Sequence, residues 1–92
     1  MSRLDGGTVL RFPPYVKFRF DGKRQAWVVL APERLLLPDE QAVEILKLVD
    51  GKRNIDAVID DLAAQFDASR TEIAGDVQAM LQDLLDKKVL QR

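Results

Sequence analysis

Residues 26–37, AWVVLAPERLLL, limit the fold of this chain more than any other stretch. Two short apolar runs, residues 26–30 and 35–37, are separated by a segment that contains Pro32. β-Branched and aromatic residues favour strands, and Pro32 would break a helix. The stretch therefore predicts two strands joined by a tight turn. Because Pro38 follows and has no backbone N–H, we expect the second strand to be short, with an open apolar edge.

A third strand is predicted just before this stretch. Residues 15–20 alternate, with Val16, Phe18 and Phe20 on one face and polar or charged neighbours on the other. Asp21-Gly22 begins a loop of hairpin length. The simplest product is a three-stranded antiparallel meander with one face on a core.

Three amphipathic helices are predicted after Pro38. The first has Asp39 as its N-cap and ends at Asp50-Gly51, with Gly51 in the left-handed conformation. The second begins at Asn54. The third begins with a capping box, SRTE, in which the Ser69 side chain accepts from the Glu72 amide.

These elements define an α+β fold class. A three-stranded antiparallel sheet is followed by a three-helix bundle, and together they are the parts of a winged helix-turn-helix. We expect one domain over residues 15–92. Residues 1–14, with Gly6-Gly7 and Pro13-Pro14, predict a flexible N-terminal arm.

The composition excludes several classes of function. The 92 residues contain no cysteine and no histidine, which removes thiol and imidazole catalysis and the common zinc sites. Asp56 and Asp60 share a helical face, and such a pair is typical of a solvated surface. We therefore expect no enzyme, catalytic residue, metal site or cofactor. No signal peptide or membrane-length apolar run occurs, which predicts a cytoplasmic, water-soluble protein.

DNA binding is the alternative hypothesis, because winged helices often place their third helix in the major groove. Here that helix carries Glu72, Asp76, Asp83 and Asp86, with lysines only at its far end. Phosphates would be repelled by these carboxylates. A winged-helix DNA-binding regulator therefore remains the less favoured interpretation, and we expect no nucleic-acid partner.

A peptide-binding groove is the favoured hypothesis. The open edge at residues 35–37 lies beside the third helix in the predicted fold, and an extended peptide adds to such an edge as a further strand. Trp27 has two interpretations. Its ring packs under the stems of Lys17 and Arg19, or it forms a contact surface for another protein.

The chain resembles the PqqD family of pyrroloquinoline quinone (PQQ) biosynthesis. The resemblance spans nearly everything after Pro14. Two positions depart from the family: Val49 stands where a cysteine is frequent, and Met80 stands where an aromatic residue is usual. The resemblance is carried by FRFD at residues 18–21, AWVVLAPERLLL at 26–37, VDGKRNIDAVIDDLAAQF at 49–66 and DVQAMLQDLLDKKVL at 76–90.

The resemblance implies a recognition element for ribosomally synthesised and post-translationally modified peptides (RiPPs). Such a protein is a non-catalytic chaperone that binds the precursor peptide PqqA by strand addition and presents it to the radical SAM enzyme PqqE. We expect a monomer without membrane contact, whose open edge offers a route to a dimer. The candidate peptide-binding residues are Arg34, Leu35, Leu36 and Leu37 from the strand, and Ile73, Val77, Met80, Leu81 and Leu84 from the third helix; Trp27 is the candidate partner contact.

Overall fold

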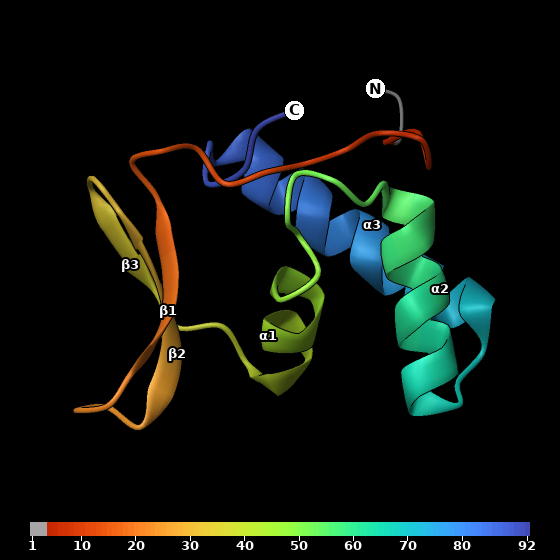
Figure 1. Cartoon of the computed structure of the whole chain (residues 1–92), viewed down its shortest axis with the longest axis horizontal. Coiled ribbons are helices and arrows are strands. Elements are labelled where there is room, and N and C mark those ends of the chain that lie inside the picture. The colour runs from red at the N-terminus through yellow and green to blue at the C-terminus, as the bar shows by residue number, and fades with distance from the viewer. Residues whose placement is uncertain (1–3) are drawn as a thin grey trace.

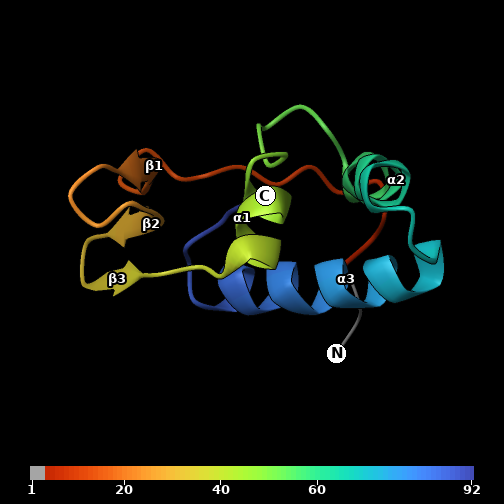
Figure 2. The same ribbon diagram turned by 90° about the horizontal axis from the view of Figure 1, so that it is seen from below.

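A computed structural model describes residues 4–92, which form three strands followed by three helices. Figure 1 shows the sheet at one side of the molecule and α2 at the other, with α1 between them, and Figure 2 shows α3 running beneath α1 and α2. This arrangement confirms the predicted α+β fold. The elements are β1 (Lys17–Asp21), β2 (Ala26–Ala31), β3 (Arg34–Leu36), α1 (Glu40–Leu46), α2 (Ile55–Phe66) and α3 (Arg70–Asp86).

The sheet is the predicted antiparallel meander, in the order β1-β2-β3. Phe18 lies opposite Val29, and Val29 lies opposite Leu36. Residues directly opposite each other share a face of the sheet. Val29 is buried in the main core, and Phe18 and Leu36 pack against that core. One face of the sheet is therefore attached to the helices through these side chains.

The main core lies between the helices and is closed by the C-terminal segment. Val89 and Leu90 follow α3 and are each only 1% exposed. Their position buries apolar surface that α3 alone would leave open, at roughly 25 cal/mol per Å² of area removed from water. The helical members of the core are Ile45 and Leu46 from α1, Ile55, Val58, Ile59 and Leu62 from α2, and Val77, Leu81 and Leu84 from α3.

Helix α1 begins as predicted but ends early. Asp39 is its N-cap, and its carboxylate accepts the Ala42 N–H at 2.8 Å. The helix ends at Leu46 because the next N–H groups, those of Leu48 and Val49, bond to carbonyls three residues back, which tightens the chain out of α-helical geometry. Gly51 has the predicted left-handed φ of 75°, but it lies in the turn after the helix.

The turn after α1 is held by Asp50. Its Oδ1 accepts the backbone N–H groups of Lys52 and Arg53, both at 2.9 Å. Hydrogen bonds to the ionised carboxylate, chiefly from the Arg53 amide, lower the pKa of Asp50 below its ordinary value.

The starts of α2 and α3 are held in different ways. Asn54 caps α2, and its Oδ1 accepts the Ala57 N–H at 2.8 Å, as predicted. Ser69 is the N-cap of α3, but its side chain makes no capping hydrogen bond, so the predicted capping box is wrong. The Arg70 Nε donates to Asp60 Oδ1 at 2.6 Å, which ties the first turn of α3 to α2 and raises the pKa of Arg70.

The segment before the sheet packs against the domain. The Thr8 carbonyl accepts the Ile55 N–H at the start of α2, and Arg11 and Gln91 exchange two backbone hydrogen bonds. Leu10 is 3% exposed and belongs to the core. This packing differs from the flexible arm that the sequence predicts for residues 1–14. Its partners lie far away in the chain, where no local pattern reveals them. Residues 1–3 lie outside the described residues.

Within residues 4–92, no helix combines the length and the apolar character that crossing a bilayer requires.

Replacing Asn54 with alanine should lower the free energy of unfolding by about 1 kcal/mol, because an N–H at the start of α2 loses its partner. Urea denaturation measures the change. Ser69→Ala is the matched control, since Ser69 makes no side-chain cap bond, and its effect should stay within about 0.5 kcal/mol. Equal losses in both variants would contradict this account of the caps.

Leu10→Ala should lower the free energy of unfolding by about 2–5 kcal/mol, because it leaves a cavity in the core. Leu37→Ala, at a side chain that is 61% exposed, should change it little. The measurement is again the urea midpoint. A Leu10→Ala protein as stable as the parent would show that this segment is not part of the folded core.

Candidate functional site

The outer edge of β3 is open. β3 pairs with β2 along one side, and no strand among residues 4–92 pairs with its other side. Two apolar side chains stand beside this edge in contact with solvent, Leu35 at 41% and Leu37 at 61% exposed. Unpaired backbone groups next to exposed leucines form a template that accepts another extended chain.

The register of the hairpin decides which backbone groups face outward. Pro32 and Glu33 form a two-residue turn, so Ala31 and Arg34 are the hydrogen-bonded pair that closes it. Hydrogen-bonded and non-hydrogen-bonded pairs alternate along an antiparallel ladder. Leu36 therefore bonds to β2, whereas the N–H and C=O of Leu35 point away from β2 toward the open edge.

The predicted strand residues differ in their surroundings. Leu36 is partly buried and packs against the main core, so its side chain anchors β3 to the domain. Leu35 lies opposite Leu30, on the other face of the sheet. Arg34 is exposed at the turn and makes no ion pair with any described residue. The guanidinium of Arg34 is therefore open to an acidic ligand.

The predicted helix residues are divided between the core and the surface. Val77 and Leu81 are each 1% exposed and Leu84 is 8% exposed, so their side chains fill the core. A peptide reaches these three only if the core opens. Ile73 and Met80 are partly buried and remain accessible at the margin of the core.

The two accessible residues of α3 lie toward different ends of the helix. The C-terminal end of α3 points toward the sheet, and Figures 1 and 2 agree on this direction. Met80 lies in the C-terminal half of α3. Ile73 lies in the first turns, away from the sheet. Of the five predicted helix residues, Met80 is therefore the accessible one in the half of α3 whose end points toward the sheet.

Trp27 packs in an aromatic row rather than under Lys17 and Arg19. Its ring stacks on Phe18 at a centroid distance of 4.8 Å and meets Phe20 edge-on at 5.9 Å. Lys17 and Arg19 lie opposite Leu30 and Val28, which places them on the other face of the sheet. The prediction that their stems cover the ring is therefore wrong. The ammonium of Lys47 lies over the ring instead, 5.2 Å from its centroid.

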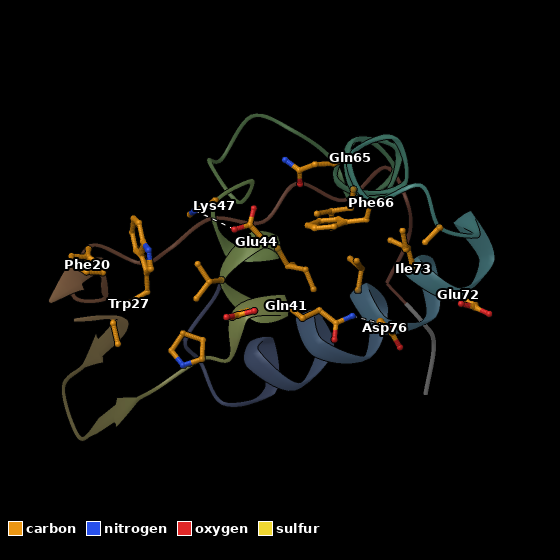
Figure 3. A pocket seen from close by; sticks show the side chains of 18 of the residues that line it. Phe20, Trp27, Gln41, Glu44, Lys47, Gln65, Phe66, Glu72, Ile73 and Asp76 are labelled. Atoms are coloured by element: carbon orange, nitrogen blue, oxygen red, sulfur yellow. Dashed lines mark hydrogen bonds and ion pairs between the residues drawn. The ribbon is translucent and has the colours of Figure 1, made fainter. Parts of the chain in front are cut away.

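A second concave surface lies along α1, and Figure 3 shows it from close by. We call it the α1 cleft. Its volume is about 1050 Å³. One wall is the end of the β1–β2 hairpin, with Phe20 and Trp27, and the other wall is formed by Phe66 and Ile73 from α2 and α3. Phe66, the last residue of α2, has a side chain that is 54% exposed.

Within residues 4–92, no three His, Cys, Asp or Glu side chains gather closely enough to hold a metal ion. Asp56 and Asp60, which share one face of α2, are exposed and pair with Arg70. The Oδ1 atom of Asp56 lies 3.5 Å from an Arg70 Nη atom, and the Oδ1 atom of Asp60 lies 2.6 Å from Arg70 Nε. These ion pairs join α2 to α3.

Comparisons with known proteins agree with the fold. A family model for coenzyme PQQ synthesis protein D (PqqD) matches residues 26–90. The PqqA binding protein of Rhodopseudomonas palustris (strain BisB5) is 59% identical over 78 residues, which cover 85% of this chain and 76% of the relative.

Two solved structures are also similar to this chain. One is the solution NMR structure of the PqqD truncation of Methylobacterium extorquens PqqCD, described as a functional, stand-alone RiPP recognition element. It has a TM-score of 0.80 and 41% identity, over 96% of this chain and 94% of that one. The other is the crystal structure of PqqD from Xanthomonas campestris. It has a TM-score of 0.62 and 30% identity, over 97% of this chain and 99% of that one. By sequence and by fold, the chain belongs to the PqqD family.

Proposed function

We propose that this protein is a non-catalytic peptide chaperone of PQQ biosynthesis that binds the precursor peptide PqqA by strand addition to β3. The observation that carries the proposal is the open β3 edge, where the backbone of Leu35 faces outward between a tight turn and Pro38. The PqqA binding protein of R. palustris supports PqqA as the ligand, and the M. extorquens recognition element supports the class of function.

Affinity in this mode comes from backbone pairing and a few apolar anchors. The N–H and C=O of Leu35 make one hydrogen-bonded pair with the peptide, and each bond contributes about 0.5–1.5 kcal/mol. Leu35 and Leu37 are exposed beside the added strand, and Met80 offers an apolar contact from α3. From these contacts we expect an affinity near the micromolar range, about −8 kcal/mol.

Charge directs an acidic peptide toward this end of the molecule. The chain through Arg34 carries seven basic and three acidic residues, whereas the remainder carries seven basic and twelve acidic. Lys17, Arg19 and Arg34 are exposed on or beside the sheet. Electrostatic complementarity of this kind raises association rates and helps to fix the direction of the peptide.

Presentation to the radical SAM enzyme PqqE is the second part of the proposal. A peptide held in extended form on a folded domain reaches an enzyme as part of one larger ligand, which raises its effective concentration at the active site. The protein itself supplies no chemistry and acts as a monomer. A second copy would compete with the peptide for the same β3 edge.

The DNA-binding alternative is not favoured by the surface of α3. Glu72, Asp76, Asp83 and Asp86 are all exposed along this helix. A recognition helix with these carboxylates on its surface repels the phosphates that supply most non-specific affinity.

Leu35→Pro should weaken binding of a labelled PqqA peptide about two- to tenfold, because it removes one outward N–H and its hydrogen bond of roughly 0.5–1.5 kcal/mol. Proline is tolerated at a strand edge that makes no internal bond through that N–H. Fluorescence anisotropy measures the affinity, and circular dichroism checks that the variant is folded.

Leu35→Ala is the matched control for this substitution. It removes the exposed side chain and keeps the backbone N–H, so the difference between the two variants isolates the backbone bond. If folded Leu35→Pro binds the peptide as tightly as Leu35→Ala, the peptide does not add to β3 as a strand.

A further inference from the structure

The α1 cleft is a second surface with the character of a binding site. Its walls expose large apolar side chains, Phe20 at 49% and Phe66 at 54%. They stand on opposite sides of α1, whose polar side chains line the space between them (Figure 3). Exposed apolar groups that gather in a concave site rimmed by polar residues mark sites of interaction.

The cleft is also strongly acidic. Among the described residues that line it, four carry carboxylates and one, Lys47, carries an ammonium group. Lys47 is already engaged, because its Nζ lies 3.2 Å from Glu44 Oε2 and over the ring of Trp27. The four carboxylates belong to Glu40 and Glu44 of α1 and to Glu72 and Asp76 of α3.

Two of these carboxylates are free to meet a ligand. Asp76 accepts a hydrogen bond from the Gln41 side chain at 3.2 Å, and Glu44 is paired with Lys47. Glu40 and Glu72 are exposed and make no ion pair with any residue between 4 and 92. They belong to the margin of the cleft, Glu40 from α1 and Glu72 from the first turn of α3, so two elements contribute unpaired negative charge to this margin.

We propose that the α1 cleft docks a cationic amphipathic segment of a partner protein. In this complex two apolar side chains of the segment contact the Phe20–Trp27 wall and the Phe66–Ile73 wall. Lysine or arginine side chains between them face the acidic margin to which Glu40 and Glu72 belong. Charge complementarity selects this occupant, because an acidic peptide would be repelled by the same rim.

The cleft is separate from the β3 edge. The residues that line it include none of β3 and do not include Met80. The inference therefore goes beyond the peptide-binding proposal, since one copy of the protein holds a peptide at β3 and a partner protein at α1. Only the fully buried Val77 and the marginal Ile73 belong both to the cleft and to the predicted peptide-binding set.

The test uses a designed helical peptide with leucines at positions i and i+7 and lysines at i+3 and i+4, which share one face. Its control carries glutamates in place of the lysines. Trp27 is the only tryptophan of the chain and forms one wall of the cleft, so its emission reports occupancy directly. The lysine peptide should shift this emission saturably, more weakly as salt rises, and the glutamate peptide should not.

Three variants locate the interaction. Glu40→Gln combined with Glu72→Gln should weaken binding of the lysine peptide about three- to tenfold, because two exposed charges are lost. Phe66→Ala should weaken it by about tenfold through loss of an aromatic anchor. Asp86→Asn, which removes an exposed carboxylate of α3 outside the cleft, is the matched control and should have no effect.

Three outcomes would overturn the inference. The first is equal binding of the lysine and glutamate peptides, or an unchanged Trp27 signal. The second is displacement of the lysine peptide by a PqqA peptide, which would make the cleft part of the peptide site. The third is self-association of the protein that Phe66→Ala abolishes, which would identify a second copy as the occupant. PqqA binding that fails while the lysine peptide still binds would contradict the proposed function alone.

Discussion

Among the residues that the structure describes, β3 pairs along only one of its edges, and the rest of this structure depends on that constraint. The Pro32 turn and Pro38 limit β3 to Arg34–Leu36, and Leu36 is the side chain that attaches it to the core. The helices pack against one face of the sheet and leave its margin uncovered. An edge this short carries little risk of unwanted pairing, yet it presents the outward N–H and C=O of Leu35.

The fold separates two kinds of surface and keeps both on rigid supports. Basic side chains gather on the sheet, and acidic side chains gather on the helices. Helix α3 connects the two, because its C-terminal end points toward the sheet while Glu72 and Asp76 rim the α1 cleft. Val77, Leu81 and Leu84 fix this helix in the core, so the two surfaces keep the same position relative to each other. A domain built in this way suits the proposed role, in which one copy holds a peptide and a partner protein at the same time.

Much of the fold could be predicted from local patterns. Alternation and turn residues identified the three strands, and the polar caps Asp39 and Asn54 marked two helix starts. Local patterns do not show what covers a side chain. Leu10 packs against distant partners, Trp27 meets Phe20 rather than basic stems, and Val77 faces the core instead of a ligand. The α1 cleft escaped prediction for the same reason, since its walls come from four elements.

Amide hydrogen exchange at β3, measured residue by residue, tests the central claim most directly. In the free protein the Leu35 amide should exchange rapidly and the Leu36 amide slowly. Of these two residues, Leu36 forms backbone hydrogen bonds to β2, whereas the N–H of Leu35 points toward the open edge. Saturating PqqA peptide should protect Leu35 and leave Leu36 unchanged. A Leu35 amide that is already protected in the free protein, or that stays unprotected in the complex, would contradict strand addition at this edge.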